Sequence, residues 1–260
     1  MPQIDSGIPS FQRIALFSDI HGNLPALQAV YQHAQSYGAQ IFLNAGDIVG
    51  YGPFPNECIQ FIRSKKMVNV IGDYDQKVLC FPQKKEKYAK KKHPLKVHAF
   101  QWTYDQLSQE NLEFLLALPV SEKISFADKT IFLTHGAPLD IKAHLGFRTT
   151  QQEWKLNQEK AQSDFIITGN SHVFWKKKVG DSIFINPGSV GRQDDGDPRA
   201  SYAMLSLGNS IQINHFRVAY DISTLLSAFE VYNLPVEFSY MFRNGINLDN
   251  TLEELAQAEK

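Results

Sequence analysis

Cysteine, net charge and long apolar runs are what this sequence has least of. Its two cysteines, Cys58 and Cys80, are too few for a disulfide framework and lie in no metal-binding motif, so we expect free thiols in a reducing compartment. A formal net charge of -1 gives no overall field that would draw the protein to nucleic acid or to a membrane. No apolar run approaches the roughly 18 residues that a membrane-spanning helix needs. These absences argue against a disulfide-stapled protein, a membrane protein and a basic nucleic-acid-binding protein.

The N-terminal segment, Met1 to Gln12, has no basic region followed by an apolar core, so we expect no signal peptide. With 43% hydrophobic and 20% charged residues, the composition is that of an ordinary soluble globular protein. The expected location is therefore the cytoplasm, with no membrane partner.

The first 80 residues contain three units in which an apolar strand is followed by a loop and a helix. The strands are expected at residues 13–18, 40–44 and 67–71. Asn23 is suited to cap the first helix, and a second helix is expected over residues 55–65. Such repeated units predict a layered and mostly parallel α/β fold.

The rest of the chain mixes helical and alternating patterns. Helices are expected over residues 95–118 with a division at Ser108, over 151–162, and in a tail from Asp221 that breaks at Pro235 and Gly245. Paired strands are expected at 120–126 with 130–134, at 173–179 with 182–186, and at 202–207 with 211–216 across Gly208-Asn209; residues 165–168 form a short buried strand. No change in composition marks a boundary, so we expect one domain over residues 1–260, with a core at 13–216 and a helical tail at 221–260.

The segment from Lys84 to Lys92 carries a dense run of lysines between Pro82 and Pro94. One interpretation is a solvated surface loop; another is a cationic lip that attracts an anionic substrate or partner. Nucleic-acid binding is not favoured, because no aromatic platform accompanies the lysines.

Polar side chains follow the predicted strands at the points where the strands end. These motifs are Asp19-x-His21, Gly46-Asp47, Gly72-Asp73-Tyr74-Asp75, His135-Gly136 and Gly169-Asn170-Ser171-His172. Ligands bind at the carboxyl ends of strands in open α/β sheets, and glycine allows the backbone to approach a ligand closely. Carboxylate and imidazole together suit divalent metals such as Mn, Fe or Zn.

In this order, the five motifs resemble those of the calcineurin-like metallophosphoesterases. The resemblance extends to Gly50-Tyr51-Gly52-Pro53 and to Asn186-Pro187-Gly188-Ser189-Val190-Gly191, and it covers about residues 13 to 245. These further motifs resemble a bacterial and archaeal branch labelled as diadenosine tetraphosphatase- or protein phosphatase-related. The resemblance implies a four-layer α/β/β/α sandwich of two mixed sheets, two divalent metal ions and a small phosphorylated substrate.

The resemblance also implies a ligand set. The first metal ion would be bound by Asp19, His21, Asp47 and His172. Asp47 would bridge to a second ion, which Asp73, His135 and Asn170 would also bind. A hydroxide shared by the two ions would attack phosphorus in line.

This sequence departs from the family pattern at the second ion. Asp73 stands where relatives have asparagine, and Asn170 stands where they have histidine. The oxygen-rich set favours Mn, with Mg, Fe or Zn as alternatives, and the second site is expected to be weak or empty.

The candidate catalytic and substrate-binding residues include further departures. Tyr74 replaces the histidine thought to protonate the leaving group; a tyrosine pKa near 10 makes a poor acid at pH 7, and the side chain could instead fill space. Asp75 either supports that position or caps the following helix. Arg192 and Arg199 are candidates for substrate binding, or for surface ion pairs.

Two functional hypotheses follow. The first is a dimetal phosphoesterase that acts on phosphomonoesters, phosphodiesters or phosphoanhydrides, with Asp47, Tyr74 and Asp75 as candidate catalytic residues. The second is a degenerate relative with little turnover that binds a metal, a nucleotide or a protein. Metal stoichiometry would distinguish the two.

Overall fold

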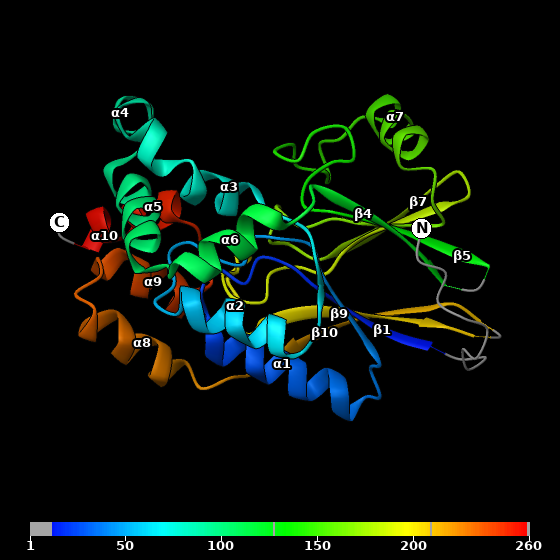
Figure 1. Cartoon of the computed structure of the whole chain (residues 1–260), viewed down its shortest axis with the longest axis horizontal. Helices are drawn as coiled ribbons and strands as arrows, with labels where there is room; N and C mark the ends of the chain where they lie inside the picture. Colours follow the sequence, from blue (N-terminus) through cyan, green and yellow to red (C-terminus); the bar gives the residue numbers. More distant parts are fainter. Residues whose placement is uncertain (1–11, 127, 209, 259–260) are drawn as a thin grey trace.

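Two five-stranded sheets lie face to face in the computed structural model, within the residues that it describes, 12–126, 128–208 and 210–258 (Figure 1). The N-terminal segment up to residue 11 and the Asn209 position of one expected turn lie outside the described residues. Helices cover the outer face of each sheet. The expected four-layer α/β/β/α sandwich of two mixed sheets is thus confirmed.

The first sheet is built around the largely buried strand β1 (Gln12–Phe17). Its order is β10 (Gln212–Val218), β9 (Ala200–Leu207), β1, β2 (Ile41–Asn44) and β3 (Val68–Asn69). β1 is parallel to β2 and antiparallel to β9. Because side chains alternate along a strand, Ile14 and Leu16 face the second sheet while Ala15 and Phe17 face the helices.

The second sheet supplies the opposite wall of the core between the sheets. Its order is β4 (Ser121–Phe126), β5 (Lys129–Thr134), β6 (Phe165–Ile167), β8 (Ser182–Asn186) and β7 (Trp175–Val179). Ile131 and Leu133 of β5 pack with Leu16 of β1 in one buried cluster. β5, β6 and β8 run parallel, so the carboxyl ends of these strands point to the same edge.

The helices fall into two groups. α1 (Leu24–Ser36) and α2 (Pro55–Ser64) cover the first sheet, and α7 (Gln151–Ala161) covers the second through Trp154. The remaining helices are α3 (Asp73–Leu79), α4 (Phe81–Lys91), α5 (Pro94–Gln106), α6 (Gln109–Ala117), α8 (Ile222–Val231), α9 (Val236–Asn244) and α10 (Leu248–Ala258). Most of them gather at one end of the sheets, on the left of Figure 1.

The lysine-rich run forms helix α4, so its interpretation as a surface loop was wrong. Pro82 lies in the first turn, where a missing N–H costs nothing, and lysine is itself a good helix former. Phe81 and Tyr88 are buried two turns apart, and the Tyr88 ring lies 5.6 Å from that of Phe100 in α5. Two aromatic anchors therefore hold an otherwise polar helix on the molecule.

Candidate metal centre

The predicted ligands lie in loops at the carboxyl ends of strands from both sheets. Asp19 follows β1, Asp47 follows β2, and His135 directly follows β5. Asn170 and His172 follow β6. The face-to-face packing of the sheets brings these loops together at one edge, as expected for ligand binding in α/β sheets.

These loops turn sharply. Among the described residues, five predicted ligands have left-handed backbones: Asp19 (φ 55°), His21 (φ 48°), Asp47 (φ 53°), Asn170 (φ 65°) and His172 (φ 57°). The Asp19 N–H donates to the Gly46 carbonyl at 3.0 Å, which ties the first loop to the second. This conformation costs a non-glycine residue about 1–2 kcal/mol, so the surrounding hydrogen bonds must hold it in place.

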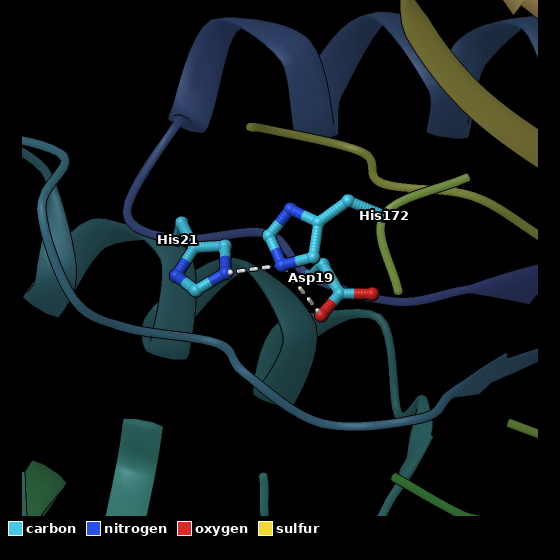
Figure 2. Close-up of side chains that lie close together, drawn as sticks. All are labelled: Asp19, His21 and His172. Atoms are coloured by element: carbon cyan, nitrogen blue, oxygen red, sulfur yellow. Dashed lines mark hydrogen bonds and ion pairs between the residues drawn. The ribbon is translucent and has the colours of Figure 1, made fainter. Parts of the chain in front are cut away.

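Asp19, His21 and His172 form the first cluster (Figure 2). Their nearest atoms converge: His172 Nε2 lies 3.4 Å from His21 Nε2 and 3.4 Å from Asp19 Oδ1. All three side chains are buried. Burial lowers the pKa of His21 and of His172 well below the usual value, so both imidazoles are neutral and hold lone pairs for a metal ion.

Asp19, Asp47 and His135 form the second cluster. Asp47 Oδ2 lies 3.4 Å from His135 Nε2 and 3.6 Å from His21 Nε2, between the imidazoles of the two clusters. Burial opposes charge on His135, but the carboxylates of Asp47, Asp19 and Asp73 together outweigh it and raise the pKa of His135 to about 10. Burial raises the pKa of Asp19 to about 7.

Two other predicted ligands, Asp73 and Asn170, flank these clusters. One oxygen of Asp73 contacts the Lys77 ammonium, four residues further along α3, and the other is buried with no hydrogen-bond partner among the described residues. The Asn170 N–H donates to both Asp19 oxygens at 3.2 Å, whereas its side-chain nitrogen is buried and unpartnered in the described chain. Lys77 was not anticipated; the signal available was its i, i+4 spacing from Asp73.

The donor set fits divalent metal ions. His135 Nε2 and Asp73 Oδ1 are buried without a hydrogen-bond partner among the described residues. Buried polar atoms are seldom left without a partner, and a cation would pair with Asp73 Oδ1 and, once the Nε2 proton has left, with His135 Nε2. Gly72 makes room for the site, because a Cβ there would lie 2.0 Å from Asp47 Oδ1.

Tyr74 and Asp75 both make structural contacts. The Tyr74 ring meets that of His21 edge-on at 5.2 Å, and its hydroxyl lies 3.1 Å from the Tyr51 hydroxyl. Burial raises the pKa of Tyr74 well above its usual value, so the phenol stays neutral. The Asp75 carboxylate accepts the Gly72 N–H at 2.9 Å and the Val49 N–H at 3.0 Å, which caps α3 and joins it to the Asp47 loop.

The two candidate arginines differ in position. Arg192 is buried, and its guanidinium lies 3.1 Å from His172 Nε2 and 2.9 Å from Asp194 Oδ1. The Arg199 side chain is 55% exposed and pairs with Asp197. Only Arg192 of these two touches a residue of the clusters.

The α/β/β/α sandwich and the buried aspartate and histidine clusters at its strand ends agree with the fold and site that the calcineurin-like resemblance implies. Residues 13–210 match the calcineurin-like phosphoesterase superfamily domain, and the chain belongs to that family. None of the helices among the described residues is both long and apolar enough to span a membrane.

Curated proteins and solved structures are similar to the chain over most of its length. The chain is 31% identical over 237 residues to the uncharacterized protein MJ0912 of Methanocaldococcus jannaschii, covering 85% of this chain and 93% of that one. It is 26% identical over 196 residues to the phosphodiesterase YfcE of Escherichia coli, covering 74% of this chain and 86% of that one. A metallophosphoesterase structure from Sphaerobacter thermophilus is similar at a TM-score of 0.72 and 27% identity, covering 91% and 100%. The protein PH1004 of Pyrococcus horikoshii shares the fold at a TM-score of 0.79 and 19% identity, covering 90% and 98%.

Proposed function

We propose that this protein is a metal-dependent phosphoesterase that hydrolyses small phosphomonoesters, phosphodiesters or phosphoanhydrides. The observation that carries the proposal is the convergence of Asp19, His21 and His172 beside Asp19, Asp47 and His135. When bound, divalent ions would activate water and stabilise the charged phosphoryl oxygens. Mn is the preferred ion, because the set predicted for the second ion (Asp47, Asp73, His135 and Asn170) is rich in oxygen.

The chain's own residues would orient the substrate. Arg192 is buried against the first cluster, and a guanidinium there suits a phosphoryl oxygen. Tyr74 is a poor proton donor because burial raises its pKa. Hydrolysis should therefore favour leaving groups that need no proton, such as phosphoanhydrides or nitrophenolate.

A cavity of about 580 Å³ offers room for the organic part of a substrate. Its lining includes Ala137, two residues after His135, and Ser171, between Asn170 and His172. Leu139 and Phe147 add apolar surface, and the Phe147 side chain is almost fully exposed. Apolar walls beside a few polar groups are typical of small-molecule sites.

The test is hydrolysis by protein stripped with a chelator and reloaded with Mn. We expect turnover of p-nitrophenyl phosphate, bis-p-nitrophenyl phosphate or a dinucleoside polyphosphate only after loading. Asp47→Asn should lower kcat/KM at least about 100-fold, since even residues that support metal ligands cost 10–100-fold. Asp197→Asn, outside both clusters, is the control. No turnover of any of the three substrates by loaded wild-type protein would refute the proposal.

The second candidate is a degenerate relative that binds a metal, nucleotide or protein with little turnover. It is favoured by one observation: Asp73 contacts Lys77 and belongs to neither cluster. Two ions per chain would support the enzyme, and one or none would support the binder. In the double variant Asp73→Asn with Asn170→His, a large gain in activity would mean that the native second site is weakened, whereas a loss would mean that the native pair works as it stands.

A further inference from the structure

A second cavity, of about 530 Å³, lies beside the metal centre and is lined largely by lysines. Its six lysines are Lys77, Lys84, Lys87, Lys91, Lys92 and Lys142. They come from α3, from α4 and its C-terminal end, and from the loop after β5. Asp73 is the one acidic residue in the lining. We call this cavity the lysine pocket.

The lysines of helix α4 lie on different faces of the helix. Lys84, Lys87 and Lys91 are three and four residues apart, so they project from one side of the helix, and all three line the lysine pocket. Lys85 and Lys90 belong to the same helix but are absent from the lining. The lysines of α4 therefore do not form a uniformly solvated surface, because three of them line one cavity.

The charges of the lysine pocket are poorly compensated. Among the ion pairs of the described residues, only Lys77 of the six has an acidic partner, Asp73. Burial lowers the pKa of Lys92, and the nearby charge of Lys77 adds to this effect. A concave wall carrying one sign of charge concentrates the local potential and attracts oppositely charged ligands.

Lys77 joins the lysine pocket to the metal centre. Its ammonium contacts the carboxylate of Asp73, and the backbone N–H of the next residue, Tyr74, donates to Asp47 Oδ1 at 2.8 Å. Asp73 thus lies both in the lining of the lysine pocket and next to the residue that contacts Asp47.

We propose that the lysine pocket binds a second anionic group of a substrate that carries at least two phosphates, while the scissile phosphate lies at the metal centre. This rests on the phosphoesterase function proposed above. A small molecule fits better than nucleic acid, because the remaining lining is mostly apolar and its one aromatic residue, Tyr88, is buried and offers no platform for bases.

Binding to metal-free protein separates the lysine pocket from metal chemistry. The probe is inorganic tripolyphosphate, titrated by calorimetry in the presence of a chelator. The variant Lys87→Gln with Lys91→Gln should bind at least about tenfold more weakly than wild type, since hydrogen bonds to charged groups contribute strongly. The matched control, Lys85→Gln with Lys90→Gln, removes the same charge from the same helix and should stay within about twofold, because screened surface charges contribute little.

Kinetics of the Mn-loaded protein complete the test. For a nucleoside 5′-triphosphate, KM should rise about tenfold in the Lys87/Lys91 variant, and for the 5′-monophosphate it should not change. Turnover of p-nitrophenyl phosphate, which has one phosphate, reports the phosphoesterase function separately and should be equal in both variants. Equal weakening of tripolyphosphate binding in both double variants would overturn the proposal, as would tighter binding of a single-stranded oligonucleotide that is lost in the Lys87/Lys91 variant.

Discussion

At the residue scale, hydrogen bonds to backbone carbonyls decide which nitrogen two of the histidines present. His172 Nδ1 donates to the Arg192 carbonyl, and His135 Nδ1 donates to the Ala45 carbonyl at 2.7 Å. Each Nε2 is thereby directed at an aspartate of the clusters. Carbonyl partners of this kind orient metal-binding imidazoles in proteins.

The raised pKa values predict proton release on metal binding. At pH 7, His135 (pKa about 10) is protonated on both ring nitrogens and is positively charged. Asp19 (pKa about 7) is protonated in about half of the molecules. Metal ligands must lose these protons, so metal affinity should rise with pH between 6 and 8, by up to about tenfold per unit for each proton released. Calorimetry of Mn binding in two buffers with different ionisation enthalpies should give about one to two protons per chain.

His135→Gln provides the control for this measurement, because it removes the protonated imidazole. It should release about one proton fewer than wild type. Equal proton release from both proteins, or none from wild type, would contradict the protonation state described for the second cluster.

At the scale of single elements, Asn23 begins α1 and also ties it to the rest of the molecule. Its side-chain oxygen accepts the Ala26 N–H at 3.1 Å, while its amide nitrogen donates to the Gly191 carbonyl at 2.9 Å and to the Tyr220 hydroxyl at 3.1 Å. The residue is fully buried. One side chain therefore links the loop before α1 to two segments far along the chain.

Asn23→Ala should lower the free energy of unfolding by about 2–4 kcal/mol, because a helix cap is worth about 1 and an unpaired buried carbonyl costs about 1–3. Asn23→Ser keeps a capping oxygen but loses the amide donors, so it should recover about 1 kcal/mol. Urea unfolding of the three proteins measures both differences. Identical stabilities for the serine and alanine variants would show that the cap contributes nothing.

The elements that the sequence predicted well are those set by local patterns. The cap at Asn23, the division between two helices at Ser108 and the pairing of residues 173–179 with 182–186 depend on nearby residues, and the structure confirms them. Helix α4 was missed because its two buried aromatics stand among lysines, and one of them, Tyr88, packs against Phe100 of a different helix.

The same distinction holds for the candidate site. Asp19 and His135 could be placed together because the carboxyl ends of buried strands meet at one edge of the fold. The pairing of Asp73 with Lys77 could not be predicted from the sequence, because it depends on where α3 begins and on the rotamers that the helix allows. The lysine pocket also needed the structure, since Lys142 is distant in sequence from α4.

At the scale of the whole molecule, the clusters join the two sheets. Asp19 and His21 follow β1 of the first sheet, whereas His172 follows β6 of the second. Asp47 and His135 connect the sheets in the same way. A metal ion bound at either cluster would thus cross-link the two halves of the sandwich.

Loading with metal should therefore stabilise the whole fold. At a free Mn concentration 100 times Kd, binding adds about 2.7 kcal/mol, which raises Tm by about 5–10 °C for a chain of this size. Scanning calorimetry with Mn and with a chelator measures the shift. His172→Ala should reduce the increase in Tm. An unchanged Tm in wild type would mean that no ion binds between the sheets.

The left-handed backbones of five predicted ligands bear on the history of the chain as well as on its chemistry. At each of these positions glycine would relieve about 1 kcal/mol of backbone strain, so aspartate, asparagine or histidine is kept there for what its side chain does. Once a metal-binding function is lost, selection no longer keeps the strained residue, and a substitution that relaxes the backbone is tolerated. Aspartate and histidine at Asp19, His21 and His172 are therefore the residues that a purely structural descendant would have been quickest to discard.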